Sequence, residues 1–203
     1  MAVLRSICVY CGSGAGSNPA FVKAAVTLGR AMAEADIRLI YGGGSVGLMG
    51  TVARAVLEAG GEVTGIIPRF LQGRERKMDD LTETILTEDM HQRKMLMFER
   101  ADAFVALPGG VGTLEELVEQ ITWAQLGRHR KPVLIGNIDG FWDALVTLLE
   151  AMRAEGFIRR EMDVSYLVAR AAEEIVPALA RAVAETPETE LRRQAAAGPI
   201  SRM

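Results

Sequence analysis

Short apolar runs and longer helical patterns alternate along most of this 203-residue chain, and this alternation restricts the fold more than any other feature. A run such as Val105-Ala106-Leu107 is apolar at consecutive positions, which is typical of a strand buried on both faces of a sheet. Strands separated by helical segments pair in parallel, because a parallel pair needs a long crossover connection. The alternation therefore predicts an α/β fold: a doubly wound, mostly parallel sheet between two helix layers, in a Rossmann-like three-layer sandwich.

Five apolar runs along the chain have the length and composition of strands. They are Ser6 to Tyr10, Arg38 to Tyr41, Glu62 to Ile67, Ala103 to Leu107 and Pro132 to Ile135. The helical patterns between and after them are Pro19 to Ala35, Val46 to Ala59, Asp89 to Arg100, Leu114 to Leu126 and Phe141 to Glu155. Thr82 to Leu86 is a further candidate strand, and Ala171 to Ala184 is a candidate last helix. We expect a single domain over residues 1–185 and a flexible tail over residues 186–203.

Composition narrows the classes of function. With 49% hydrophobic and 24% charged residues and a net charge of −3, the chain has no basic excess of the kind that accompanies nucleic-acid binding. Its beginning lacks the pattern of an export signal, and no run reaches the roughly 18 apolar residues of a membrane-spanning helix. Cys8 and Cys11, the only cysteines, flank a strand end where side chains point to opposite faces, which disfavours a disulfide. We expect a cytoplasmic protein that binds neither nucleic acid nor membranes.

Glycine-rich loops follow three of the predicted strands. They span Cys11 to Gly16, Gly42 to Gly50 and Pro108 to Gly112. In a doubly wound sheet, ligands bind beyond the carboxyl ends of the strands, where these loops come together. One such loop is ordinary turn chemistry, but three of them predict a site for a ligand as large as a nucleotide.

The loop from Pro108 to Thr113, between the run Ala103 to Leu107 and a helical pattern, has the features of a phosphate site. Its glycines let the backbone approach an anion, and the N–H groups and dipole of the following helix attract negative charge. Thr113 adds a hydroxyl that can donate to a ligand or cap the helix. Glu115 and Glu116 would repel a phosphate, so we expect at least one of them to face another part of the ligand, as in chemistry on a nucleotide sugar. An ordinary strand-to-helix turn is the alternative.

Other nucleotide and metal motifs are incomplete. The spacing Gly42-x-Gly44-x-x-Gly47 satisfies the dinucleotide fingerprint, but the acidic residue expected about 20 positions later is missing. Arg69 lies there instead, which leaves recognition of a 2′-phosphate, as in NADP, as an open alternative. No loop ends in the Gly-Lys-Ser or Gly-Lys-Thr of a P-loop, and His91 and His129 lie outside any ligand-spaced cluster. We therefore expect neither a metal nor a cofactor.

A charged cluster, Met90-His91-Gln92-Arg93-Lys94, begins a predicted helix. Basic side chains near a helix N-terminus oppose the dipole, which indicates a role for Arg93 and Lys94 other than helix stability. Two solvated cations on a surface helix are the plainer interpretation. Glu115 and Glu116 follow about twenty residues later, past one strand, and this spacing predicts an ion pair between neighbouring elements.

In combination, three segments closely resemble the LONELY GUY family. They are the Met90 to Lys94 cluster, the segment Pro108 to Glu116 and the loop Gly42 to Gly50, and the similarity extends over about Ile7 to Leu149, including Ile121 to Gly127. Members of this family are cytokinin riboside 5′-monophosphate phosphoribohydrolases, long mislabelled as possible lysine decarboxylases. The resemblance implies hydrolysis of the N-glycosidic bond of an adenosine-type 5′-monophosphate, which releases free base and ribose 5-phosphate.

The family motif Pro-Gly-Gly-x-Gly-Thr-x-x-Glu places the catalytic glutamate at Glu116, and the family's catalytic arginine falls on Arg93. Such cleavage passes through an oxocarbenium-like state at C1′, so we expect the Glu116 carboxylate to stabilise that charge and to accept a proton from water. Arg93 would hold Glu116 ionised and positioned, or bind ligand hydroxyls or phosphate. The resemblance further implies substrate contacts at Gly43, Gly44, Glu75, Lys94, Gly109, Gly110, Val111, Gly112, Thr113, Leu114, Glu115 and Thr122.

The resemblance also suggests a homodimer with active sites close to the subunit interface. Family members differ in their preference for N6-prenylated nucleotides or for AMP, and Met49, Met90, Met95 and Met97 either line an apolar base pocket or belong to the core. A non-catalytic nucleotide-binding or sensing module is the alternative function, because a fold does not establish an activity. Pyridoxal-phosphate chemistry is not expected, since nothing marks a Schiff-base lysine.

Overall fold

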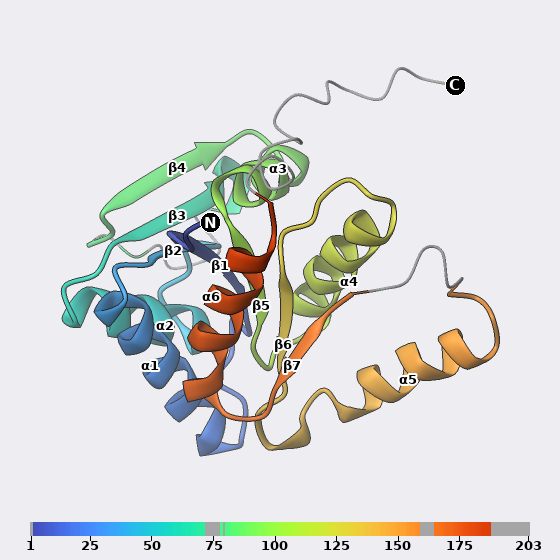
Figure 1. Cartoon of the computed structure of the whole chain (residues 1–203). Coiled ribbons are helices and arrows are strands. Elements are labelled where there is room, and N and C mark those ends of the chain that lie inside the picture. The colour runs from blue at the N-terminus through green and yellow to red at the C-terminus, as the bar shows by residue number, and fades with distance from the viewer. Residues whose placement is uncertain (1, 72–77, 79, 159–164, 188–203) are drawn as a thin grey trace.

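A computed structural model describes residues 2–71, 78, 80–158 and 165–187. Its strands form one sheet in the order β4-β3-β2-β1-β5-β6-β7, and every neighbouring pair is parallel (Figure 1). The order reverses between β1 and β5, which defines a doubly wound sheet and confirms the predicted fold class. The strands are β1 (Ser6–Tyr10), β2 (Arg38–Tyr41), β3 (Val63–Pro68), β4 (Glu83–Thr87), β5 (Ala103–Ala106), β6 (Val133–Gly136) and β7 (Leu167–Ala169).

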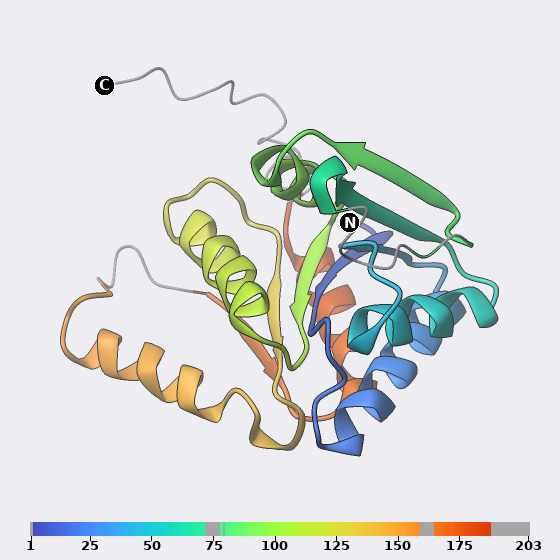
Figure 2. The same ribbon diagram turned by 180° about the vertical axis from the view of Figure 1, so that it is seen from behind.

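Helices cover both faces of the sheet and complete the three-layer sandwich. One face carries α1, α2 and α6 and the other carries α3, α4 and α5, and Figures 1 and 2 show the molecule from opposite sides. No helix in the described ranges combines the length and apolar character that a bilayer crossing requires. From residue 188 onward, the predicted tail lies outside the described residues. The helices are α1 (Pro19–Glu34), α2 (Gly47–Glu58), α3 (Met90–Arg100), α4 (Val111–Gln125), α5 (Asp143–Ala154) and α6 (Ile175–Glu185), with short 3-10 turns η1 (Arg69–Leu71), η2 (Ile138–Gly140) and η4 (Ala172–Glu174).

Alternate residues of β1 point into two separate cores. Ile7 and Val9 belong to the core beneath α1 and α2, whereas Cys8 and Tyr10 belong to the core beneath α3 and α4. Cys11 lies in the first of these cores, so the two cysteines are on opposite sides of the sheet. Both are buried free thiols, as the sequence predicts, and burial raises the pKa of each well above its ordinary value. The thiols therefore remain protonated at neutral pH.

The structure contains one strand that the sequence does not predict, and it begins α4 earlier than predicted; in both places the sequence signal is weak. The sequence does not predict β7, because it is three residues long and Leu167 and Val168 are 37% and 42% exposed at the sheet edge. Helix α4 begins at Val111 rather than at Leu114. The sequence does not predict this earlier start, because Val111 is 83% exposed and adds nothing to the apolar periodicity. The earlier start moves the helix N-terminus into the middle of the glycine loop.

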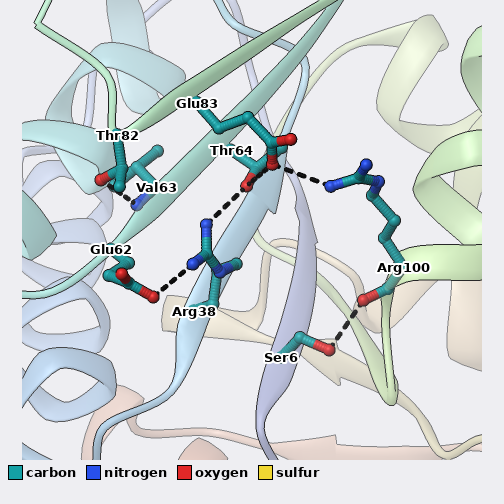
Figure 3. A network of polar contacts seen from close by, with 8 residues as sticks. All are labelled: Ser6, Arg38, Glu62, Val63, Thr64, Thr82, Glu83 and Arg100. Atoms are coloured by element: carbon teal, nitrogen blue, oxygen red, sulfur yellow. Dashed lines mark hydrogen bonds and ion pairs between the residues drawn. The ribbon is translucent and has the colours of Figure 1, made fainter.

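Polar side chains tie the strands together at the amino edge of the sheet, the edge opposite the glycine loops (Figure 3). Arg38 of β2 pairs with Glu62 and donates to Thr64 Oγ1 of β3 at 3.1 Å. Thr64 Oγ1 donates to Glu83 Oε2 of β4 at 3.0 Å, and Arg100 at the end of α3 donates to the same oxygen at 2.8 Å. This network fixes β2, β3, β4 and the end of α3 relative to one another.

The start of β1 is held at the same edge by Asp102, which immediately precedes β5. Its Oδ2 accepts hydrogen bonds from the backbone N–H groups of Arg5 and Ser6 at 2.9 and 3.0 Å. The Ser6 hydroxyl in turn donates to the carbonyl of Arg100 at 2.8 Å (Figure 3). The starts of the two central strands and the end of α3 are thus connected to the network across β2, β3 and β4.

His129 lies in the core beneath α3 and α4, with ring centroids 5.3 Å from Phe98 and 5.6 Å from Phe104. Burial lowers the pKa of His129 from 6.5 to about 4. As pH falls from 6.5 to about 4, His129 binds a proton in the unfolded chain but not in the folded protein. The free energy of unfolding therefore decreases over this range, by about 3 kcal/mol in total. Urea denaturation at several pH values should show that His129→Phe removes this part of the pH dependence. If the free energy of unfolding of His129→Phe depended on pH as that of the wild type does, buried neutral His129 would not be the source of this pH dependence.

Candidate active site

The three glycine-rich loops meet at the carboxyl edge of the sheet, where the strand order reverses. The backbone N–H of Gly12 donates to the carbonyl of Pro108 at 3.1 Å, which links the loop after β1 to the loop after β5. The carbonyl of Gly12 accepts from the N–H of Leu48 at 3.0 Å, which links the first loop to the start of α2. The loops therefore surround the switch point between β1 and β5, the place where doubly wound sheets bind ligands.

The loop before α4 leaves open space in front of a helix N-terminus. Gly110 is the N-cap and supplies no side-chain cap, and the first intrahelical bond runs from the N–H of Leu114 to its carbonyl at 3.0 Å. The preceding N–H groups have no intrahelical acceptor. A Cβ added to Gly110 or Gly112 would meet no heavy atom of the described residues within 4 Å, whereas one added to Gly109 would lie 2.1 Å from Oγ1 of the buried Thr113. The loop combines backbone donors with room for an anion, which is the geometry that phosphate binding requires.

Glu116 lies half-buried in the first turns of α4. Burial raises the pKa of its carboxyl to about 7, the Arg93 guanidinium counteracts this rise, and the Glu115 carboxylate adds to it. Within the described residues, the Glu116 carboxylate forms no ion pair of its own. A carboxyl group whose pKa lies near 7 gains and loses its proton readily at neutral pH, which is what a general acid or base needs.

Arg93 is buried on α3, with only 7% of the residue exposed. One terminal nitrogen donates to the sulfur of Met90 at 3.7 Å, and a Cβ added to Gly42 would lie 2.1 Å from the other. Its Nε is buried and has no hydrogen-bond partner in the described part of the chain. A buried guanidinium held by so weak an acceptor is costly, because its Nε–H lacks the partner that water would give it. A buried N–H without a partner is a group that a ligand hydroxyl or anion could satisfy.

Lys94 points from α3 toward two carboxylates of α4. Its ammonium donates to Glu115 Oε1 at 2.8 Å and to Glu119 Oε1 at 2.9 Å. Burial by itself lowers the pKa of Lys94, but the hydrogen bonds to Glu115 and Glu119, together with the negative charges of these two carboxylates, outweigh burial and raise it overall. The predicted ion pair between neighbouring elements is confirmed for Lys94 and Glu115, and Glu119 is a second partner that the sequence analysis did not identify.

The loop after β2 brings Gly43 and Gly44 to the same edge. Gly43 has a φ of +80°, and an added Cβ would lie 2.2 Å from a side-chain carbon of Ile67. A Cβ on Gly44 would lie 2.9 Å from the terminal methyl of Met49, which is itself buried in the core. Only glycine fits at Gly43, because both the left-handed backbone and the contact exclude a side chain. The close packing fixes the backbone of this loop beneath Arg93.

Three further predicted contacts differ in their placement. Val111 is 83% exposed at the first position of α4, at the mouth of the site. Thr122 lies eleven residues further along the helix, and its hydroxyl donates to the carbonyl of Val118 at 2.7 Å, within the helix itself. Glu75 lies outside the described residues, so its contact stays a prediction.

The described residues hold no group of three or more His, Cys, Asp or Glu side chains placed to bind a metal ion. His91 is exposed on α3, whereas His129 is buried in the core. Arg69, the alternative ligand for a 2′-phosphate, forms an ion pair with Glu88 at 2.9 Å.

The sequence assigns no contact role to Gly42 or Glu119. Gly42 belongs to the glycine loop Gly42 to Gly50, but its contact with Arg93 joins two elements and is visible only in three dimensions. Glu119 lies four residues after Glu115 on α4, and this spacing was the available signal that both carboxylates share a helix face.

Relatives of the chain share one activity in their names. The family model described as "Possible lysine decarboxylase" matches residues 49–179. The chain is 53% identical over 154 residues to cytokinin riboside 5′-monophosphate phosphoribohydrolase LOG7 of Arabidopsis thaliana, a match that covers 76% of this chain and 71% of that protein. It is 48% identical over 181 residues to cytokinin riboside 5′-monophosphate phosphoribohydrolase LOG of Oryza sativa subsp. japonica, covering 89% and 75% of the two chains.

Solved structures share the fold at lower identity. The molybdenum cofactor carrier protein of Chlamydomonas reinhardtii superposes with a TM-score of 0.67 at 22% identity, covering 90% of this chain and 99% of that chain. The molybdenum cofactor binding protein of Rippkaea orientalis superposes with a TM-score of 0.66 at 23% identity, covering 87% and 95%. Likeness at this identity concerns the fold alone, whereas the sequence matches identify the family. The chain belongs to the LONELY GUY family, that of the cytokinin riboside 5′-monophosphate phosphoribohydrolases.

Proposed function

We propose that the protein hydrolyses the N-glycosidic bond of cytokinin 5′-monophosphates, which are N6-modified adenosine monophosphates, and of AMP, giving free base and ribose 5-phosphate. The observation that carries the proposal is Glu116, whose pKa burial raises to about 7 close behind an open helix N-terminus and beside the buried Arg93. The family members at 53% and 48% identity are named for the same reaction.

In the proposed reaction, Glu116 acts at the anomeric carbon of the sugar. The bond from C1′ to the base nitrogen breaks and a bond from C1′ to the water oxygen forms. The Glu116 carboxylate takes a proton from that water, and the base nitrogen gains one, so that one water molecule is divided between the two products. Positive charge builds on the sugar as the first bond lengthens, and an ionised carboxylate stabilises it. Arg93 lowers the pKa of Glu116 and so favours its ionised form. Its Nε–H, which has no partner among the described residues, is proposed to donate to a sugar hydroxyl.

The 5′-phosphate is assigned to the loop before α4. The backbone donors there lie away from the reacting carbon, so their binding energy helps to hold the sugar in place for the chemical step. Further polar or close backbone contacts are proposed around the ligand. The proposed substrate contacts are Gly43, Gly44, Glu75, Lys94, Gly109, Gly110, Val111, Gly112, Thr113, Leu114, Glu115 and Thr122.

Base release tests the proposal directly. Purified protein is incubated with AMP and, separately, with N6-isopentenyladenosine monophosphate, and free base is separated by chromatography. Preferential release from the prenylated nucleotide would support cytokinin activation, and comparable release from AMP would indicate a general monophosphate nucleosidase. Binding of both nucleotides without any free base would contradict the hydrolase and identify a sensing module.

Activity should follow the ionisation of Glu116. Its pKa of about 7 means that the carboxyl is protonated in acid, where it neither stabilises positive charge nor accepts a proton. Below that pH, kcat/KM should fall about tenfold for each pH unit. Initial rates measured in buffers from about pH 5 to about pH 9 check this, and a profile that stays flat through neutrality would remove Glu116 from the rate-determining step.

We also propose that the protein is a cytoplasmic homodimer. The two buried free thiols support the compartment. Apolar side chains on α4 and at its end support the association, because Val111, Val118 and Leu126 are 83%, 39% and 66% exposed. Sedimentation should give a dimer for the wild type and a monomer for Val118→Arg. Val3→Arg, at a site 65% exposed on a different part of the molecule, is the control and should remain dimeric.

A further inference from the structure

The two ion pairs of Lys94 join the helices that carry Arg93 and Glu116. Lys94 follows Arg93 directly on α3, and Glu115 directly precedes Glu116 on α4. Glu119 lies about one turn beyond Glu115 on the same helix face. Because the Lys94 ammonium lies 2.8 Å from one carboxylate and 2.9 Å from the other, it holds α3 against α4 right beside the pair proposed to act on the sugar.

The bond to Glu119 is the more protected of the two. The Lys94 and Glu119 side chains are 18% and 21% exposed, whereas that of Glu115 is 53% exposed. Exposed ion pairs are screened by water and salt and contribute little, so the bond to Glu119 is the one that can hold the two helices firmly. Glu119 also keeps its second oxygen buried and, in the described part of the chain, without a hydrogen-bond partner. An incompletely paired buried carboxylate costs stability, and such a cost is typical of functional sites.

We propose that Glu119 is a positioning residue: by holding Lys94 it fixes α3 against α4, and so sets the separation of the Arg93 guanidinium and the Glu116 carboxylate. This inference rests on the proposed hydrolase function. In this inference, the main role of Lys94 is to connect α3 to α4 through its two ion pairs. Two of the three ammonium donors are engaged with carboxylates, which leaves one for the substrate contact that the family resemblance implies.

Glu119→Gln is the direct test, because it keeps the shape of the side chain and removes its charge. We expect kcat to fall by about 10-fold to 100-fold while KM changes by less than about 3-fold, since a small misplacement of reacting groups affects the chemical step more than binding. Glu62→Gln is the matched control, because it breaks the ion pair with Arg38 at the opposite edge of the sheet. It should keep the wild-type kcat. Glu119→Gln with the wild-type kcat would overturn the inference.

A double-mutant cycle asks whether Glu119 acts through Lys94. The variants are Lys94→Met, Glu119→Gln and the combination of the two. If Glu119 acts only by holding Lys94, the double variant loses no more kcat than Lys94→Met alone. Losses that multiply would show that Glu119 acts independently of Lys94, and would overturn the positioning role.

Titration of Glu116 by carboxyl-carbon NMR supplies a readout that does not depend on turnover. The charged and titratable groups that influence Glu116, or are influenced by it, are Arg93 and Lys94 of α3, Glu115 and Glu119 of α4, Cys8 and Tyr10 of β1, and Cys11. Glu119→Gln should move the Glu116 midpoint to lower pH, because it removes a negative charge and frees Lys94. Glu62→Gln should leave the midpoint in place.

The titration also separates failure of this inference from failure of the proposed function. If the wild type releases base and Glu119→Gln has the same kcat, the positioning role is overturned and the hydrolase proposal stands. If the wild type releases no base, the hydrolase proposal fails. An unmoved Glu116 midpoint in Glu119→Gln would then overturn the inference as well, and a lowered midpoint would show that Glu119 still acts on the Glu116 carboxyl.

Discussion

Glu116→Gln is expected to abolish base release and, at the same time, to stabilise the folded protein at neutral and alkaline pH. The amide cannot stabilise the developing charge at C1′ or accept a proton, so we expect a loss in kcat of about 10²-fold to 10⁴-fold. Stability changes because burial raises the pKa of the carboxyl from 4.5 to about 7 in the folded protein. Burial therefore favours the protonated form: stability from this site is complete below pH 4.5 and is lost as pH rises through about 7.

The neutral amide does not carry this cost of burying a charge. Above about pH 7 the variant should be more stable than the wild type, by up to about 3 kcal/mol, and the difference should vanish toward pH 4.5. Urea denaturation across this range, together with nucleotide binding and base release, checks both halves. Glu58→Gln, at the exposed end of α2, is the control and should change neither property. A Glu116→Gln protein that turns over normally, or that gains no stability in alkali, would refute the corresponding half.

Gly42→Ala is expected to reduce kcat/KM by about 10²-fold with the fold intact, because the added methyl displaces Arg93 from its place beside Glu116. The new Cβ would lie 2.1 Å from a terminal nitrogen of Arg93 and 3.3 Å from the sulfur of Met49. The far end of an arginine moves more easily than backbone, so the contact shifts the guanidinium rather than β2. Thermal unfolding should therefore stay close to that of the wild type.

Gly14→Ala is the comparison for this effect. It adds the same methyl group in the loop after β1, where no heavy atom of the part of the chain that the structure describes lies within 4 Å of the new Cβ. We expect a much smaller loss of kcat/KM than for Gly42→Ala. Equal activities of the two variants would show that the position of Arg93 against Gly42 does not matter for turnover.

The parts of the fold that the sequence predicts well are those buried on both faces of the sheet. The predicted bounds of β1 and β2 coincide with the observed Ser6–Tyr10 and Arg38–Tyr41, because continuous burial demands an uninterrupted apolar run. The meeting place of the glycine loops follows from topology, since parallel strands bring their carboxyl ends to one edge. Burial of β7 and the first turn of α4 is slight, so their sequences carry little of this signal.

The candidate site is only partly contained in local sequence. Arg93 and Glu116 stand in motifs, and the pairing of Lys94 with Glu115 follows from spacing past one strand. The contact of Gly42 with Arg93 and the bond of Lys94 to Glu119 depend on how two elements pack and which way their side chains point. These contacts arise only when the sheet and its helices have assembled, so they cannot be predicted from any short segment of the sequence.

The network at the amino edge of the sheet has a consequence for how this fold diversifies. Arg38, Glu62, Thr64, Glu83 and Arg100 join strands and helix at the edge far from the glycine loops (Figure 3). Asp102 adds the start of β1. Polar side chains therefore connect the scaffold at one end of the strands, while the other end carries the loops that we propose to bind the substrate. The loops at the carboxyl ends of the strands can therefore change during evolution, and with them the range of substrates, while the polar network at the amino ends is retained.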